Sequence, residues 1–404
     1  MHFLTPSHWR PGTLGPLVLC AALAAGGPIF RNVAANEPRP DAPHIAQLVR
    51  QLGSVKFAER ERASRELTAL GIVAKDALTA AIDDPDAELR NRARDVLAIV
   101  TDADFAARLN AFEADYDGRR GLTLPGWEMF AERFGGHPPN RRLFAEMARH
   151  EPHLLEAYAE RPETVADVLD ARCADLLEQY VQVAGLKPEF PVGTIATLLL
   201  IGSDDGVTVD EQFASQLFTW MIYQSSFKEP ARSGPWSASM KKLLGNWVAR
   251  DVSPSVTMQN LILAASYELH PQGLALAKKV LDSEPATPRL HEFALMAIGR
   301  FGDRQELPLV EKFLDDATVC GAVHLRKPPR QIELQLRDVA LAVAVHLTSQ
   351  DAESYGSADV QSSPQTFFQI PTLAFTTESK RSAALTRWSE WRSKYPDDDQ
   401  PAVP

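Results

Sequence analysis

The hydrophobic positions in residues 57–100 follow the spacing of short amphipathic helices. Ala63, Leu67 and Leu70 fall on one face of a first helix, and Gly71 follows at the place where a glycine commonly ends one. Two further helical runs come next, with apolar residues at Leu78 and Ile82 in the first and at Ala93, Val96, Leu97 and Val100 in the second. Two short antiparallel helices followed by another of the same kind predict one unit of a stacked helical array.

The same pattern returns near the C-terminal end of the chain. Ala294, Ile298, Phe301 and Gly302 repeat the first four positions at a constant offset, since 294 − 63 and 302 − 71 both equal 231. Leu309 and Phe313 repeat Leu78 and Ile82 at that same offset. In each copy the alanine, Ala63 or Ala294, permits a close approach of two helices. The two larger apolar residues that follow it fill the layer between stacked units. The agreement predicts an internal repeat.

Residues 48–100 also resemble a known family. The FAERERAS segment, the L-x-x-L-G helix end and the D-P-D-A-E-L-R turn are similar to HEAT repeats. In particular they resemble a group of bacterial HEAT-repeat proteins that begin with export signals. The resemblance covers about this one stretch. It implies a protein-interaction scaffold, and it supplies no catalytic residues.

From these patterns we predict an all-α fold, a HEAT-like α-solenoid of stacked antiparallel helix pairs with an irregular helical middle block. The predicted segments are a signal peptide (1–35), a spacer (36–43), N-terminal HEAT-like repeats (44–116), the irregular helical block (117–250), C-terminal HEAT-like repeats (251–348), a lid loop with a capping helix (349–395) and a disordered acidic tail (396–404).

Four segments carry more specific expectations. The apolar run 194–201 (TIATLLLI) reads as a buried helix or a strand, and we choose a helix because no other strand candidate is nearby. Residues 229–235 (EPARSGP) are the clearest internal linker. Residues 331–348 form one strongly apolar helix, with Leu336, Val339, Ala340 and Val343 on its buried face. The Ser- and Gln-rich stretch 352–377 is an irregular lid on the last units.

The N-terminal residues are typical of a secretory signal peptide. Residues 14–26 are apolar, and Val33-Ala34-Ala35 places small residues before the polar stretch from Asn36, so cleavage is expected after Ala35. Two alternatives stay open. The apolar run could be an uncleaved membrane anchor. The other is lipidation at Cys20 in a bacterial lipobox, which ranks last because Leu19 is bulky where a small residue is expected.

The amino-acid composition and the net charge exclude some classes of binding partner. The chain has 404 residues, of which 45% are hydrophobic, and a net charge of −11 from 42 basic and 53 acidic residues. This acidic balance without a basic block argues against nucleic acid and anionic membrane surfaces. The charges of residues 59–66 are expected to form a solvated helix face, with the pairs Glu61–Arg65 and Arg62–Glu66.

Two cysteines remain after the predicted cleavage, Cys173 and Cys320. A disulfide between them is open to an exported protein. Each unit of a solenoid touches only its neighbours, however, so we expect two buried free thiols. No CxxC pair is present, which argues against a thiol redox site and a cysteine-based zinc site.

Sequence motifs for catalysis are missing. The chain contains no HExxH, Walker P-loop, GxSxG or GxGxxG motif. His150 and His153, with Glu151 and Glu156, are a weak metal candidate, since Pro152 predicts a helix boundary between the two histidines. A second candidate, His291-Glu292, has Leu295 where a second histidine is needed. We therefore predict no catalytic, cofactor-binding or metal-binding residue, and no cofactor.

The expected function is a non-catalytic protein-interaction scaffold of the cell envelope or extracytoplasmic space, bound to a protein or peptide partner. We expect no nucleic acid partner, and no membrane contact beyond the export signal or an N-terminal anchor. The sequence does not distinguish this binding function from that of a structural component of the cell envelope. The alternative is an exported helical enzyme with an unrecognised acid or histidine site in residues 127–250. Convergent titratable groups in a closed pocket would favour the enzyme, and an open groove would favour the scaffold.

Overall fold

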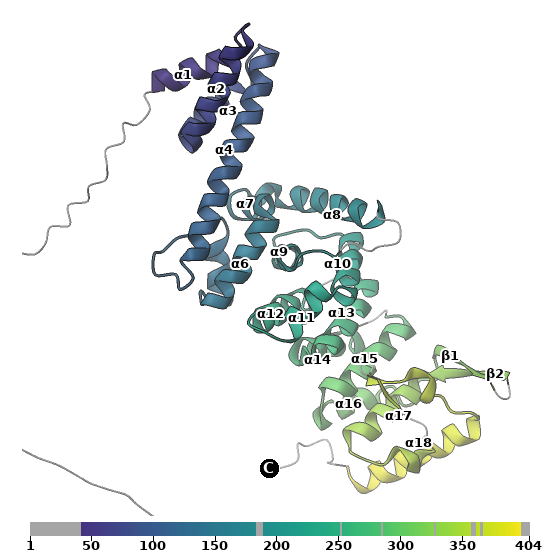
Figure 1. Cartoon of the computed structure of the whole chain (residues 1–404). Helices are drawn as coiled ribbons and strands as arrows, with labels where there is room; N and C mark the ends of the chain where they lie inside the picture. Colours follow the sequence, from purple (N-terminus) through teal and green to yellow (C-terminus); the bar gives the residue numbers. More distant parts are fainter. Residues whose placement is uncertain are drawn as a thin grey trace, which may run out of the picture. The chain divides into compact units, whose positions relative to one another are not determined.

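The computed structural model describes residues 42–182, 189–250, 253–283, 286–326, 329–356, 361–363 and 367–396. The chain is mainly helical and its neighbouring helices pack on one another, as the predicted all-α class requires (Figure 1). It divides into two compact units, residues 1–102 and 103–404, with the boundary inside one helix, α4 (Ala87–Ala114). The predicted signal peptide, its cleavage site and Cys20 lie outside the described residues.

The first unit contains three short helices and the beginning of α4. They are α1 (Ala42–Gln51), α2 (Phe57–Leu70) and α3 (Lys75–Ala81), with the 3₁₀ turn η1 (Gly71–Ala74) before α3. The predicted helices of this region are therefore confirmed, although α1 begins two residues earlier than expected. The buried core comprises Ile45, Leu48, Leu52, Ala63, Leu67, Ala74, Leu78, Ala81, Leu89, Ala93, Val96 and Val100.

The charged face of α2 differs from the expectation. The Arg62–Glu66 pair is present, with a nitrogen–oxygen distance of 3.7 Å. Glu61 does not pair with Arg65 through its carboxylate. Its carboxylate accepts a hydrogen bond from Arg92 of α4 at 2.8 Å, while Arg65 donates to the Glu61 backbone oxygen. The face therefore connects two helices, because α4 brings an arginine within reach of α2.

The second unit begins with the predicted irregular block. Its helices are α5 (Trp127–Phe134), α6 (Pro138–His150), α7 (Pro152–Glu160), α8 (Val165–Gln182), α9 (Val192–Gly202), α10 (Glu211–Tyr223), α11 (Ser225–Arg232) and α12 (Ser237–Val248), with the 3₁₀ turn η2 (Pro162–Thr164) before α8. The apolar run 194–201 lies in α9, so the choice of a helix is confirmed. Gly193 allows α9 to lie against α6, since a Cβ there would be 2.2 Å from the Glu146 backbone oxygen.

The linker prediction for residues 229–235 is wrong over its first four residues. Residues 229–232 belong to α11, and Pro230 lies inside this helix. Phe227 and Ala231 are one helical turn apart and both are fully buried. Burial of this face outweighs the hydrogen bond that Pro230 cannot donate. The connection to α12 begins only at Ser233.

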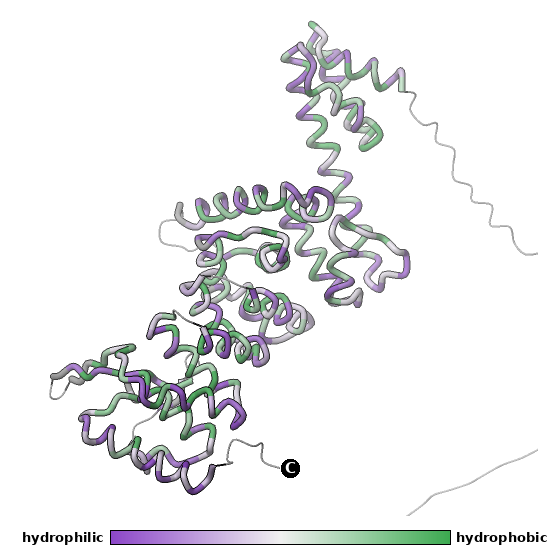
Figure 2. The backbone as a smooth tube through the Cα atoms, turned by 180° about the vertical axis from the view of Figure 1, so that it is seen from behind, coloured by the Kyte–Doolittle hydropathy of each residue, from purple (hydrophilic) through white to green (hydrophobic). Residues whose placement is uncertain are grey.

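The described C-terminal part contains six further helices, two hairpins and short turns. The helices are α13 (Pro254–Tyr267), α14 (His270–Leu281), α15 (Pro288–Phe301), α16 (Leu307–Glu311) and α17 (Leu336–Leu347), followed by the last helix α18 (Glu378–Lys394). Along the chain, α13 packs on α14 and α14 packs on α15, which also contacts α17. Figure 2 shows hydrophilic and hydrophobic residues interspersed along the helices, as expected for helices with one buried face.

Helices α2 and α15 have matching bounds. They begin at Phe57 and Pro288 and end at Leu70 and Phe301, and 288 − 57 and 301 − 70 both equal 231. Each is followed by a glycine, a 3₁₀ turn and a short helix: η1 and α3 after α2, and η3 (Arg304–Glu306) and α16 after α15. The sequence offset therefore corresponds to a repeated order of elements.

The single helix predicted for residues 331–348 is wrong at its beginning. Strand β1 (Val319–Arg326) pairs antiparallel with β2 (Pro329–Gln335), and only then does α17 begin. Ile332 and Leu334 are buried while Gln331 and Glu333 are exposed, which is the alternation of a strand. Gln335 then forms a capping box with Asp338 at the start of α17. The predicted buried face of the helix itself is confirmed.

The segment between α17 and α18 is irregular, as predicted. It contains the turns η4 (Ala352–Tyr355) and η5 (Ile370–Thr372) and a short hairpin of β3 (Ser362–Ser363) and β4 (Phe367–Phe368). Phe367 packs against His346 of α17, with ring centroids 4.6 Å apart. Helix α18 confirms the predicted final helix, and its Trp388 is buried.

Candidate functional site

One concave feature of the middle block is a cleft between α8 and α10. Its volume is about 580 Å³. Three carboxylate residues, two glutamines and four apolar or thiol-bearing residues line it: Asp170, Glu178, Asp210, Gln212, Gln216, Cys173, Ala174, Leu177 and Phe213. This cleft is our candidate functional site, and we call it the α8–α10 cleft.

The amphipathic pattern of α8 explains its side of the cleft. Val165, Leu169 and Cys173 follow helical spacing and are buried in the core of the unit. The adjacent face of the helix carries Asp170 and Glu178, which remain exposed. The helix thus places carboxylates at the rim and the edge of its apolar face at the floor.

The start of α10 provides the opposite side. Asp210 is the N-cap residue, and its carboxylate accepts a hydrogen bond from the Phe213 backbone nitrogen at 2.6 Å. This cap fixes the first turn of the helix, so Phe213 is held at the floor, where its side chain is 3% exposed. Gln216 follows one turn later and completes this wall.

The rim of the α8–α10 cleft has an excess of negative charge. Burial raises the pKa of Asp170, and the nearby carboxylates of Asp210 and Asp167 raise this pKa further. Among the described residues no cationic side chain forms an ion pair with Asp170 or Asp210. Asp170 and Asp210 therefore present negative charge that no described cationic side chain neutralises.

Cys173 lies at the floor of the same cleft. Burial raises the pKa of its thiol to about 12, and the carboxylates of Asp170 and Asp210 contribute in the same direction. A protonated thiol is a poor nucleophile and a poor metal ligand. Cys173 and Cys320 are both free and buried, so the prediction of two buried thiols is confirmed.

Other carboxylates near the core of the second unit are neutralised by arginines. Asp115 and Arg141 are 3.3 Å apart and almost fully buried. Arg172 donates to both carboxylate oxygens of Glu151, at 2.8 and 2.9 Å. Asp170 and Asp210 differ from these pairs, because no arginine of the described residues pairs with them.

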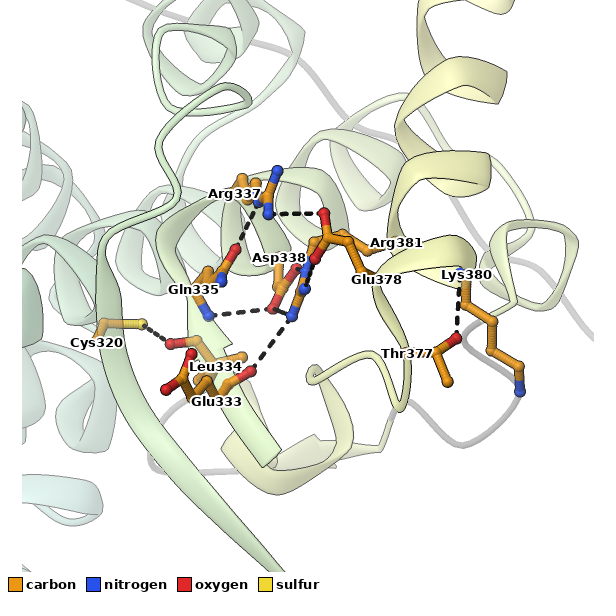
Figure 3. A network of polar contacts seen from close by, with 10 residues as sticks. All are labelled: Cys320, Glu333, Leu334, Gln335, Arg337, Asp338, Thr377, Glu378, Lys380 and Arg381. Carbon is orange, nitrogen blue, oxygen red and sulfur yellow. Dashed lines mark hydrogen bonds and ion pairs between the residues drawn. The ribbon is translucent and has the colours of Figure 1, made fainter. Parts of the chain in front are cut away.

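A second polar cluster joins β2, α17 and α18 (Figure 3). Arg381 donates to the two carboxylate oxygens of Asp338 at 2.6 and 3.1 Å, and Asp338 also accepts from the Gln335 backbone nitrogen at 3.1 Å. Arg381 further pairs with Glu378, which Arg337 contacts at 2.9 Å. The buried Asp338 and Arg381 are partnered with each other, so this cluster connects elements of the fold.

The histidine pair considered from the sequence does not form a site. His150 ends α6 and His153 lies in α7, so the predicted helix boundary between them is confirmed. Each histidine is closest to a different carboxylate, Glu146 for His150 and Glu156 for His153. Over the described ranges, no three His, Cys, Asp or Glu side chains gather closely enough to hold a metal ion.

The second histidine candidate is also occupied by other contacts. Glu292 is fully buried and accepts two hydrogen bonds from Arg289, at 2.7 and 2.6 Å. His291 packs against Phe313, with ring centroids 5.2 Å apart. Both side chains therefore make structural contacts of α15.

Sequence reasoning missed the α8–α10 cleft, because its acids come from two helices that the sequence does not relate. The available signal was the recurrence of Asp170, Ala174 and Glu178 at four-residue spacing on α8.

No protein-family model, curated protein or solved structure matches this chain. Within the described part of the chain, none of the helices has the length and apolar character needed to cross a membrane.

Proposed function

We propose that this protein is a non-catalytic scaffold that binds a protein partner through the α8–α10 cleft. The observation that carries the proposal is the cleft itself, which combines an apolar floor with the rim carboxylates of Asp170 and Asp210, neither of which forms an ion pair with a described residue. Apolar concave surfaces with a few polar groups are typical of binding sites. An exposed acidic rim adds specificity and faster association with a partner of opposite charge.

An enzyme in the same block is supported less well. General acid–base or nucleophilic catalysis needs titratable groups that converge on one reacting atom. Here Cys173 is held protonated. The buried acids Asp115 and Glu151 are already bound to arginines. The geometry of the cleft therefore favours recognition over reaction.

For the architecture we propose a HEAT-like α-solenoid. Two observations support it: the shared bounds of α2 and α15, and the packing of α13, α14 and α15 in chain order. Stacked helix pairs in which each unit contacts its neighbours are the defining property of solenoids. In such an array the irregular helices between the regular ones are suited to carry the specific surface.

We also propose that the protein is exported, because of the apolar N-terminal run and the small residues before Asn36. Mass spectrometry of the mature protein should find Asn36 as its first residue. An intact Met1 would favour the membrane anchor instead.

Site-specific photo-crosslinking in the host cell tests the scaffold function. A benzophenone amino acid at Ala174, which lines the cleft, should give an adduct with one defined protein. The same amino acid at Ala238, an exposed residue of α12 outside the cleft, is the matched control. Adducts of equal yield at both positions, or no adduct at Ala174, would overturn the proposed function.

A further inference from the structure

We propose that the α8–α10 cleft recognises an arginine side chain flanked by aliphatic residues in a peptide segment of the partner. This inference rests on the proposed function and specifies the chemistry of the partner. It follows from three properties of the cleft: its charge, its floor and its size.

The charge of the cleft selects a cation. Asp170 and Asp210 lie on opposite walls, and the Asp210 carboxylate contributes to the raised pKa of Asp170. A cation between them removes this repulsion and is attracted by both carboxylates. Elsewhere in the unit arginines occupy this role, as Arg381 does at Asp338. In the cleft no described residue forms an ion pair with Asp170 or Asp210, and the proposed ligand supplies this cation.

The two walls also favour a planar, branched cation. A guanidinium has five donors in a fixed fork and can bind carboxylates on two sides, whereas an ammonium is a compact, strongly hydrated charge. Gln216 lines the same wall as Asp210, and its buried Oε1 atom has no hydrogen-bond partner. A rotation of the Gln216 side chain toward the cleft lets this oxygen accept one of the remaining guanidinium donors.

The floor accounts for the aliphatic part of the proposed ligand. Ala174, Leu177 and Phe213 line the cleft below the carboxylates. The methylene stem of an arginine packs on such a surface while its charged head reaches the rim. With about 580 Å³, the cleft is larger than one side chain needs, so neighbouring aliphatic residues of the segment fit beside it.

Binding of labelled peptides to the full chain, followed by fluorescence anisotropy, tests the inference. The probe is a short Gly/Ser peptide with Leu-Arg-Leu at its centre. Comparison peptides replace the arginine by citrulline, which keeps the shape and removes the charge, or by lysine. A further peptide replaces both leucines by glycine. We expect the arginine peptide to bind about tenfold more tightly than each comparison peptide.

Protein variants assign the binding to the cleft. Asp170→Asn and Asp210→Asn should each weaken the arginine peptide about tenfold. Asparagine is as good an N-cap as aspartate, so Asp210→Asn leaves α10 capped. Glu132→Gln removes one charge from the exposed surface of α5 and should leave the affinity unchanged.

The outcomes separate this inference from the scaffold function. Equal binding of the citrulline or lysine peptide, or equal effects of Asp170→Asn and Glu132→Gln, would overturn the arginine assignment. If Ala174 crosslinks to a protein but no arginine peptide binds, the scaffold function stands and the arginine assignment is wrong. If the crosslink also fails, both are wrong.

Discussion

Helices α2 and α15 occupy matching positions of the repeat but have different surroundings. Both contain 14 residues, and the equivalent residues Ala63 and Ala294, and Leu67 and Ile298, are fully buried. Helix α2 buries only those two residues, and its other faces carry charges. Helix α15 buries eight: Leu290, Glu292, Ala294, Leu295, Met296, Ala297, Ile298 and Gly299.

The difference shows what a repeat pattern determines and what it leaves to context. The shared pattern sets where each helix begins and ends and which face touches its own short partner helix. Helix α15 packs on α13, α14, α17 and strand β1, whereas among the described elements α2 packs mainly on α1. Equivalent substitutions should therefore have unequal consequences in the two units.

The largest effect is expected from a charge at the shared core position. Ile298→Asp and Leu67→Asp each place a carboxylate among apolar side chains, which costs about 4 kcal/mol or more. Because the chain has two compact units, Leu67→Asp should abolish the thermal transition of the first unit only. Ile298→Asp should abolish the transition of the second unit.

Differential scanning calorimetry, with hydrogen exchange to assign each transition to a unit, measures these effects. Thr68→Asp is the matched control, because its side chain is exposed on the same helix as Leu67. If Leu67→Asp were no more destabilising than Thr68→Asp, the assignment of the buried face would be wrong.

The second largest effect concerns the buried ion pair of the second unit. In Arg381→Ala the carboxylate of Asp338, which is fully buried, loses its charged partner. Removing one member of a buried pair typically costs about 3–5 kcal/mol. We expect a loss of this size in urea unfolding, with early exchange of the α18 amides. A loss below about 1 kcal/mol would show that the pair behaves as a surface contact.

Some of these features could be predicted from the sequence and others could not. Helix bounds such as those of α2 and α15 were predictable, because apolar spacing and a final glycine are local signals. Strand β2 was missed because its short alternation, from Gln331 to Gln335, runs directly into the apolar pattern of α17. The α8–α10 cleft was missed because it depends on how Asp170 and Asp210 approach in space, which no local signal encodes.

The third experiment replaces the glycines that follow α15 and α2, Gly302 and Gly71. Each substitution should destabilise its unit, but for a different structural reason. Gly302 has a φ of −89°, but a Cβ there would lie 2.8 Å from the Ile298 backbone oxygen and 2.9 Å from the Glu306 carboxylate. Gly302→Ala should therefore destabilise the second unit by about 1–3 kcal/mol through this crowding. Gly71 has open space around it but a φ of 64°.

Gly71→Ala is the matched comparison, with an expected cost of about 1–3 kcal/mol in the first unit, because a φ of 64° with a ψ of −144° is nearly restricted to glycine. Replacement of either glycine by asparagine tests the two causes. At Gly71 asparagine should cost about as much as alanine, because this conformation lies outside the left-handed region that asparagine tolerates. At Gly302 it should be at least as destabilising as alanine, and the opposite result would contradict the crowding argument.

A fourth experiment compares the pH dependence of one carboxylate in each unit. Burial raises the pKa of Glu292, and Arg289 opposes this shift only in part. The folded state therefore holds this proton to higher pH than the unfolded state does. Its stability contribution is lost as the pH rises from the ordinary value of 4.5 through the raised pKa. Glu292→Gln should gain stability relative to the wild type over this range.

Glu88 of the first unit should show the opposite sign. The hydrogen bond from Arg92 lowers the pKa of Glu88, so its contribution is present above 4.5 and is lost as the pH falls through the lowered value. Glu88→Gln should lose stability relative to the wild type as the pH rises over that range. Urea unfolding of both variants at several pH values measures the two slopes, and slopes of equal sign would contradict the assignment.

The smallest effect is expected at the ion pairs between α2 and α4. Arg92 lies 2.8 Å from Glu61 and 2.6 Å from Glu88, but its side chain is 21% exposed and those of its partners are 40% and 48% exposed. Water screens such pairs, so Arg92→Ala should cost no more than about 1 kcal/mol, and less at high salt. Arg92→Lys keeps the charge and serves as the control. A loss as large as that of Arg381→Ala would mean that charge pairs, and not the buried Ala63–Leu67 face, hold α2 in place.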